Sequence, residues 1–285
     1  MAPAVRQLSK FATAMLVSYD GSRGWAWDPT IRGTIADTLE RILREPVAIE
    51  AASRTDAGVH AIGQALCAFT SREPLAGDLQ LLRYRANQLL PEDVVLRQVV
   101  RAPADFDVRD NAGKVYCYYI NTAAFPFPLS RRTEWHLPSR RGRAPFDAAR
   151  AQQAASYALG RHSFLPFSNA QPAEPEREPV CELRRLDVVE CGGGRIRLDV
   201  EGDRFLYRMV RNLAGTVARC GSGELEPELV ERILATGAWP SDAVKLTAPA
   251  HGLVLHQVLL HADCDPFAST AAAAEEVPLC APVPS

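Results

Sequence analysis

Residues 53–61 read Ser53-Arg54-Thr55-Asp56-Ala57-Gly58-Val59-His60-Ala61 and lie between two strand-like stretches, 46–52 and 64–70. The residues of this run are small or polar, and its glycine permits backbone angles that other residues resist. The pattern therefore predicts a tight loop between two strands, with one carboxylate at its tip beside a guanidinium.

Asp56 is the residue of this loop that is best suited to chemistry. The neighbouring Arg54 favours the ionised form of the carboxylate. An ionised carboxylate suits nucleophilic attack or proton abstraction better than acid catalysis. A turn held by a structural Arg–Asp pair would need the same two residues, so the loop alone leaves both interpretations open.

Outward from the loop, strand and helix patterns extend through both halves of the chain. The first half is βαββαβ-like, with strands at 11–19, 46–52, 64–70 and 94–100 and helices at 34–44, capped by Thr34, and 76–90. The second half has strands at 115–121, 182–190, 194–201 and 252–260, helices at 146–159, 204–219 and 225–235, and a hairpin turn at Gly192-Gly193-Gly194.

The similar order of elements predicts an α+β fold of two similar α/β halves, with antiparallel or mixed sheets and a central cleft. The expected organisation is an N-terminal extension at 1–10, an N-terminal catalytic half at 11–105 that carries the aspartate loop, a C-terminal half at 106–263 and a disordered tail at 264–285.

Composition leaves the kind of partner open. The chain has 285 residues, enough for two domains, and its formal net charge of -2 argues weakly against nucleic acid. Net charge averages over all faces, however, and only a local patch matters for binding. Arginines gather between 131 and 143, where they either contact an RNA backbone or line a solvated loop: Arg131, Arg132, Arg140, Arg141 and Arg143.

Cysteine usage indicates a reducing compartment and no metal. The 7 cysteines are scattered, with no C-x-x-C and no paired Cys/His spacing typical of zinc. No apolar run approaches the length of a membrane span and no secretory signal is present, so the expected location is the cytoplasm. The first nineteen residues contain Arg6 and Lys10 but no acid, which keeps an organelle as an alternative, with the nucleus as another.

The loop resembles the signature of the tRNA pseudouridine synthase A (TruA-like) family, with eight consecutive residues from Arg54 to Ala61 matching in character and order. Other segments resemble the family's motifs in the right sequence, and together they cover about residues 14–260: Tyr19-Asp20-Gly21 with Gly24-Trp25, Asn87 with Leu90-Pro91-Glu92-Asp93, Lys114-Val115-Tyr116-Cys117-Tyr118, Gly160-Arg161-His162-Ser163-Phe164, Phe205-Leu206-Tyr207-Arg208-Met209-Val210-Arg211-Asn212, and Thr247-Ala248-Pro249 with Gly252-Leu253.

The resemblance implies an isomerase that converts uridine to pseudouridine in tRNA, commonly in the anticodon stem-loop. It also implies the pseudouridine synthase fold, a homodimer, and no metal, nucleotide or other cofactor, because the reaction involves no redox change or group transfer. The chain departs from the family pattern at Ser22-Arg23, Ala26 and Cys181, in segments that contact RNA in the family. These departures bear on the target position and not on the chemistry.

The resemblance also implies roles for individual residues. Asp56 would act on C1′ or on the base, Tyr116 would stack on the flipped base and handle a proton, and Arg211 would pair with Asp56 or hold the substrate. The remaining substrate contacts would be Arg54, His60, Leu253 and Arg208. Tyr116 and Leu253 could instead be core residues, and Arg208 and Arg211 could form surface salt bridges on a long helix.

Two other function classes remain as alternatives. The first is a non-catalytic tRNA-binding or folding module with the same fold, which the intact Asp56, Tyr116 and Arg211 argue against. The second is a hydrolase that uses Asp56, which would need a second acid at a defined distance or a metal. No partnered acid motif is evident in the sequence.

Overall fold

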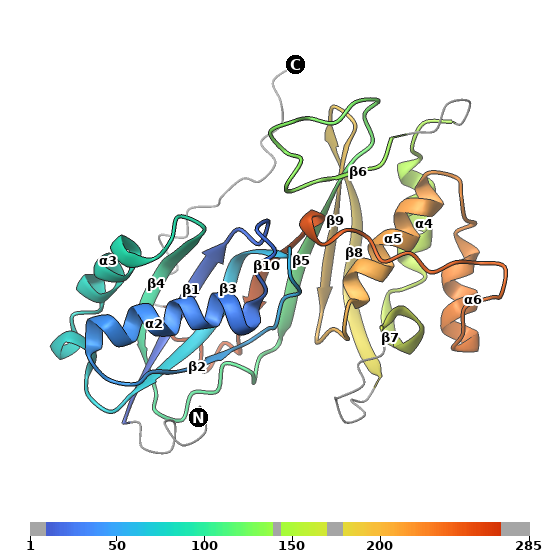
Figure 1. Ribbon diagram of the computed structural model, residues 1–285. Coiled ribbons are helices and arrows are strands. Elements are labelled where there is room, and N and C mark those ends of the chain that lie inside the picture. The colour runs from blue at the N-terminus through green and yellow to red at the C-terminus, as the bar shows by residue number, and fades with distance from the viewer. Residues whose placement is uncertain (1–9, 139–143, 170–178, 269–285) are drawn as a thin grey trace. The chain divides into compact units, whose positions relative to one another are not determined.

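The computed structural model describes residues 10–138, 144–169 and 179–268 (Figure 1). Several expectations therefore lie outside the described residues: those on Arg140, Arg141 and Arg143, on nearly all of the extension 1–10, and on the tail from 269. The chain divides into two compact units. Within the described residues, the first unit comprises 10–112 and 255–268, and the second comprises 113–138, 144–169 and 179–254.

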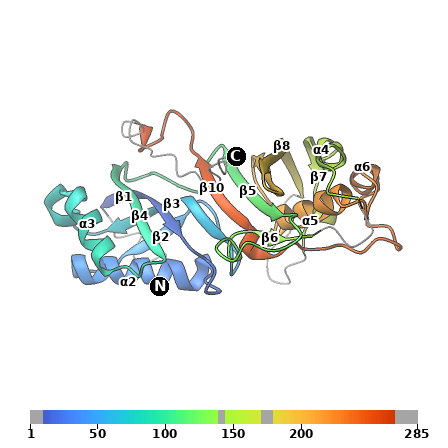
Figure 2. The same ribbon diagram turned by 90° about the horizontal axis from the view of Figure 1, so that it is seen from above.

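The first unit is a sheet with two helices packed against it and against each other (Figures 1 and 2). The strand order is β4-β1-β3-β10, and β2 also pairs with β3. Strand β1 is antiparallel to both β3 and β4, and β2 is antiparallel to β3. The elements are β1 (Phe11–Tyr19), α2 (Arg32–Leu43), β2 (Ala48–Ala51), β3 (His60–Thr70), α3 (Leu79–Leu89), β4 (Val94–Ala102) and β10 (Leu253–Leu259).

The core of this unit lies between the sheet and the helices. Ile35 and Leu39, one helical turn apart on α2, are fully buried, as is Leu82 on α3. Met15 of β1 and Leu66 of β3 are buried as well. The apolar spacing at 34–44 predicted that Ile35, Leu39 and Ile42 share the buried face; the first two are buried, and Ile42 is half-buried.

The predicted N-cap of that helix is wrong. Helix α2 begins at Arg32, because the turn Trp27–Ile31 runs into it without a break and Ile31 already has helical backbone angles. The Thr34 hydroxyl lies inside the helix and donates a 2.9 Å hydrogen bond to the Thr30 carbonyl. Its side chain therefore caps no amide.

The second unit is also a sheet with helices packed on it, in the strand order β5-β9-β8-β7, and β6 pairs parallel with β5. Helix α4 contacts β8, α5 and α6, and α5 contacts β5. The predicted turn at 192–194 is confirmed, since Gly192 at the end of β8 and the two glycines that join it to β9 all have positive φ. The elements are β5 (Gly113–Asn121), β6 (Trp135–His136), α4 (Ala148–Ser156), β7 (Gly160–Ser163), β8 (Val180–Gly192), β9 (Arg195–Gly202), α5 (Met209–Gly221) and α6 (Glu228–Thr236).

Helix α5 is the central helix of this unit, but it is shorter at its start than the predicted helix at 204–219. Arg208 has a left-handed backbone conformation, with φ 58° and ψ 11°, so the helix begins only at Met209. Arg208 therefore precedes the helix that carries Arg211 instead of sharing it. Of the 13 residues of α5, 11 are buried, which leaves Arg211 and Arg219 as the residues that reach its surface.

The α+β class with antiparallel and mixed strand pairing is confirmed. The last strand is divided between the units: residues 255–259 of β10 group with the first unit, although they belong to the range 106–263 expected to form the C-terminal half. After this strand the described chain continues in turns, where Phe267 is 7% exposed.

Candidate active site

In the first unit, the loop that carries Asp56 joins β2 to β3 and is held by the segment after β1. The Trp27 amide donates to the Thr55 carbonyl at 3.2 Å, and the Gly58 amide donates to the Trp25 carbonyl at 3.3 Å. The Tyr19 hydroxyl lies 2.7 Å from the Thr55 hydroxyl, in a buried position. The backbone on both sides of Asp56 is therefore fixed.

The turn itself closes directly after Asp56. The Val59 amide donates to the Asp56 carbonyl at 3.1 Å, and Gly58 has a φ of 87°, which glycine adopts without strain. The Asp56 side chain is half-buried. The loop thus presents one carboxylate from an ordered backbone, which is the arrangement that the sequence predicted.

Contacts of His60 and Gly21 stabilise the loop. The Nδ1 atom of His60 lies 3.0 Å from Oδ1 of Asp20, and the Gly21 amide donates to the same nitrogen at 3.2 Å. His60 is 6% exposed. A Cβ at Gly21 would lie 2.3 Å from the Val59 carbonyl oxygen, so only glycine fits this approach. His60 is thus a buried support of the loop.

Arg54, by contrast, extends into solvent from the same loop. Its side chain is 78% exposed, and its Nε lies 3.8 Å from Oδ2 of Asp28. Asp28 also accepts a 2.6 Å hydrogen bond from Arg32 Nε. The first unit therefore brings Arg54, Asp56 and His60 together on one loop, with only His60 removed from the surface.

In the second unit, Tyr116 lies on β5 and is buried. Its ring packs edge-on against Phe205, with 5.2 Å between the ring centroids. Phe205 belongs to the segment that leads into α5, so that segment holds the tyrosine ring. Arg208, three residues later, places its guanidinium 4.8 Å from the centroid of the Tyr207 ring.

Arg211 lies on the first turn of α5 and holds the segment before β10. Its Nε donates to the Ala248 carbonyl at 2.8 Å, and the Ala248 amide donates to the Arg211 carbonyl at 3.1 Å. Beside this contact, the Tyr118 hydroxyl donates to the Pro249 carbonyl at 2.8 Å. Leu253, which is 6% exposed, follows this fixed segment as the first residue of β10.

Tyr118 is a supporting residue that the sequence motif contains but that the sequence-based site does not include. Its ring is fully buried, and a Cβ at Gly252 would lie 2.7 Å from the ring. Strand β5 and the segment before β10 are therefore in close contact. Burial raises the pKa of the Tyr118 phenol, although the positive charge of Arg211 opposes the shift. The phenol therefore remains a hydrogen-bond donor across the physiological pH range.

Asn212 is a second supporting residue outside the site expected from the sequence. Its side-chain amide donates to the Phe167 carbonyl at 2.6 Å, and its carbonyl oxygen accepts from the Thr247 hydroxyl at 2.6 Å. Asn212 is fully buried next to Arg211. An asparagine within a helix of mainly apolar and small residues is the signal that could have identified it.

The described residues contain no group of three or more His, Cys, Asp or Glu side chains that could hold a metal ion. In the same part of the chain, we find no helix with both the length and the apolar character to cross a bilayer.

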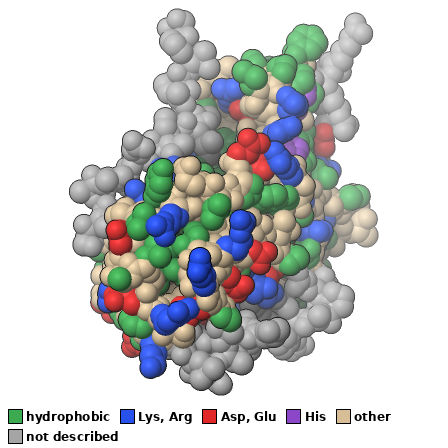
Figure 3. All heavy atoms as spheres, turned by 60° about the vertical axis from the view of Figure 1, so that its left-hand side comes forward, with side chains coloured by type: hydrophobic (Ala, Val, Ile, Leu, Met, Phe, Trp, Pro, Cys, Tyr) green, Lys and Arg blue, Asp and Glu red, His purple; other side chains and the backbone are tan. Residues whose placement is uncertain are grey.

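On the face that Figure 3 shows, Lys and Arg side chains lie among Asp and Glu side chains. Local groups, and not the net charge, therefore determine where an anionic partner could bind.

Comparison with known proteins identifies relatives along most of the chain. A family model described as tRNA pseudouridine synthase matches residues 154–259. The tRNA pseudouridine synthase A of Thermotoga neapolitana is 34% identical over 252 residues, which are 86% of this chain and 98% of the relative. That of Geotalea uraniireducens is 37% identical over 250 residues, with 86% and 97% covered. That of Myxococcus xanthus is 36% identical, with 86% and 90% covered.

Among solved structures, a chain of a Cbf5-Nop10-Gar1 complex aligns with a TM-score of 0.38 at 12% identity, covering 76% of this chain and 46% of that one. The relatives at 34–37% identity, by contrast, match along 86% of this chain and 90–98% of their own length. The chain belongs to the tRNA pseudouridine synthase A family.

Proposed function

We propose that this protein isomerises uridine to pseudouridine in tRNA, with Asp56 as the catalytic carboxylate. The observation that carries the proposal is the similarity to relatives named tRNA pseudouridine synthase A over 86% of the chain. The ordered loop that presents Asp56 supports its role, because a catalytic group must be held in place before the substrate arrives.

The reaction rearranges atoms within one nucleotide. The bond between N1 and C1′ breaks, the uracil turns, and C5 forms a new bond to C1′. The hydrogen on C5 leaves as a proton and N1 gains one, so no oxidant, reductant or second substrate is needed. Because the bond is hidden in a stacked helix, the uridine must first be turned out of its stack.

The other residues divide into those that contact the substrate and those that support them. Tyr116 would lie against the flipped base, and Leu253 would pack on the uracil face. Arg211 would hold the substrate near the reacting bond, while Arg54 and Arg208 would contact the RNA backbone. His60, which is buried, would act through the loop by holding Asp20 and Gly21 in position.

Three finer features belong to the same proposal. We propose the anticodon stem-loop as the target region, a homodimer as the assembly, and the cytoplasm as the location. They rest on the family resemblance alone, and the isomerisation itself does not depend on them.

Tritium release tests the proposal directly. An unmodified tRNA transcript with tritium at C5 of its uridines is incubated with the protein, and released tritium is counted while pseudouridine is mapped in the RNA. We expect both signals to rise together without added cofactor. Binding of the transcript without either signal would contradict the proposal and favour a non-catalytic RNA-binding module.

A further inference from the structure

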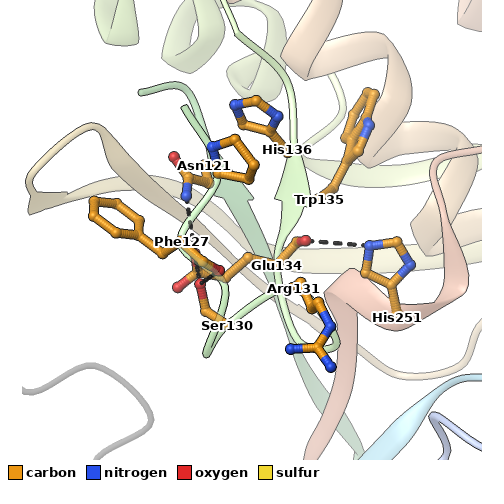
Figure 4. Close-up of a pocket in the computed structure, with 9 residues that line it drawn as sticks. Asn121, Phe127, Ser130, Arg131, Glu134, Trp135, His136 and His251 are labelled. Atoms are coloured by element: carbon orange, nitrogen blue, oxygen red, sulfur yellow. Dashed lines mark hydrogen bonds between the residues drawn. The ribbon is translucent and has the colours of Figure 1, made fainter. Parts of the chain in front are cut away.

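The second unit contains a cavity of about 230 Å³ that none of the proposed catalytic residues lines (Figure 4). The loop between β5 and β6 forms most of its wall. This volume is below the 300 Å³ or so typical of pockets for drug-sized ligands, and suits a single ring system. Six side chains give the cavity its chemistry: Asn121, Phe127, Ser130, Arg131, Glu134 and His251.

One wall of the cavity is polar and fixed. Glu134 is 8% exposed, and its Oε2 accepts hydrogen bonds from the Ser130 hydroxyl at 2.7 Å and from Asn121 Nδ2 at 3.4 Å. Its Oε1 lies 3.0 Å from Arg195 Nε. A carboxylate offers about four acceptor positions, and the two hydrogen bonds from Ser130 and Asn121 use two of them. The wall can therefore still accept one N–H from a ligand.

The cavity also has an aromatic side chain. Phe127 is 40% exposed, and the Arg195 guanidinium lies 5.0 Å from its ring centroid. Arg195 also contacts Glu134, so one cation contacts both side chains. Pro126 and Pro128 on either side of Phe127 restrict the backbone of this part of the loop.

A positive charge lies at the same site. Arg131 lines the cavity, and one of its N–H groups donates to the Pro128 carbonyl at 2.7 Å. A guanidinium has five N–H donors, so this contact leaves it able to bind a phosphate. An aromatic ring, a buried acceptor and an arginine within one small cavity match the base and phosphate of a nucleotide.

The cavity is connected to the segment that carries Leu253. His251, two residues before Leu253, places its Nε2 3.1 Å from the Glu134 carbonyl oxygen. Trp135, next to Glu134, packs edge-on against Tyr118 with 6.3 Å between the ring centroids. The wall of the cavity is therefore in contact with Tyr118 and with the segment that leads into Leu253.

We propose that this cavity binds one unstacked nucleotide of the RNA that flanks the target uridine. Its base would stack on Phe127 and donate an N–H to Glu134, and its phosphate would pair with Arg131. The inference rests on the proposed function for the identity of the RNA, but the binding it predicts does not require turnover. Contacts to flanking nucleotides are a common source of site selection in enzymes that flip bases.

The experiment measures equilibrium binding of an unmodified tRNA transcript, by filter binding, to the full chain and three variants. Phe127→Leu keeps apolar volume but removes the stacking surface, and Phe127→Trp keeps that surface. Leu129→Ala is the control, because Leu129 is 99% exposed on the same loop and does not line the cavity. We expect the leucine variant to weaken binding by roughly tenfold, as removal of one stacked base does, and the other two variants to bind within about twofold of the original chain.

Equal binding by all variants would overturn the inference. So would a change in oligomeric state of the Phe127→Leu variant with unchanged tRNA binding, which would assign the loop to a protein contact. Tritium release is measured in parallel at saturating RNA. If the original chain releases tritium and Phe127→Leu binds tRNA normally, the proposed nucleotide site is wrong and the proposed isomerase activity stands. If Phe127→Leu binds tRNA more weakly but no chain releases tritium, the proposed nucleotide site stands and the proposed isomerase activity is wrong.

Discussion

The Tyr19 hydroxyl lies 2.7 Å from the Thr55 hydroxyl, in a buried position one residue before Asp56. This contact ties the end of β1 to the loop that carries the proposed catalytic carboxylate. Strand β1 is itself paired on both sides, with β3 and β4. The position of Asp56 thus depends on the sheet, and not on the loop alone.

Removing the Tyr19 hydroxyl tests this dependence. The Tyr19→Phe variant should have an unfolding free energy about 1 kcal/mol lower, the usual net value of a buried hydrogen bond. Its kcat for tritium release should fall by roughly tenfold, because small misplacements of a catalytic group reduce the rate. Tyr84→Phe is the matched control, since Tyr84 is 63% exposed on α3. Unchanged kcat in a destabilised Tyr19→Phe protein would contradict the positioning role.

Gly21→Ala should displace the loop through a steric clash. The new Cβ would lie 2.3 Å from the Val59 carbonyl oxygen, and backbone must move to relieve it. We expect the unfolding free energy to fall by about 1–3 kcal/mol, together with reduced turnover. Gly33→Ala on α2 is the control, because nothing lies within 4 Å of its added Cβ, and it should be neutral or slightly stabilising. Equal thermal stability of the two variants would contradict this account.

Two buried thiols should make stability fall at alkaline pH. Burial raises the pKa of Cys117 from its ordinary value of 9.0 to about 12, with a contribution from the negative charge of Asp199. Burial also raises the pKa of Cys220 to about 12. Below pH 9 both thiols stay protonated in the folded and unfolded chains, so they add no pH dependence.

Between pH 9 and 12 the unfolded thiols ionise while the folded ones remain neutral, so ionisation favours unfolding. Each thiol should lower the unfolding free energy by up to about 1.4 kcal/mol per pH unit in this window. Denaturant unfolding of the original chain and of Cys117→Ala at several pH values measures the slope. An identical slope in both proteins would exclude Cys117 as a contributor.

Salt dependence tests whether the described part of the arginine-rich stretch contacts RNA. We expect tRNA binding by the Arg131→Gln, Arg132→Gln double variant to depend less steeply on salt, by roughly 0.7 to 0.9 in log–log slope for each phosphate that the variant no longer neutralises. Arg232→Gln is the control, on the exposed side of α6. An unchanged slope in the double variant would indicate a solvated loop at 131–132.

The sequence predicted those parts of the fold that local patterns encode. The period of Ile35 and Leu39 identified the buried face of α2, and the glycines at 192–194 identified the hairpin. Glycine and flanking strands likewise predicted the loop that presents Asp56.

The remaining features depend on contacts that local patterns do not carry. The left-handed angles of Arg208 delay the start of α5, and a non-glycine residue gives no sequence signal for that conformation. Strands β6 and β7 span only 2 and 4 residues, which is too short for an alternating pattern. The supporting roles of Tyr118 and Asn212 arise from partners 131 and 35 positions away, at Pro249 and Thr247.

The most direct test of the central claim is the Asp56→Asn variant, with Asp37→Asn as the control because Asp37 is exposed on α2. Tritium release and binding of the same unmodified tRNA transcript are measured for both proteins. We predict that Asp56→Asn binds the transcript within about twofold of the original chain while its release rate falls by at least about 100-fold, and that Asp37→Asn changes neither. Full tritium release by the Asp56→Asn protein would contradict the claim that this carboxylate carries the reaction.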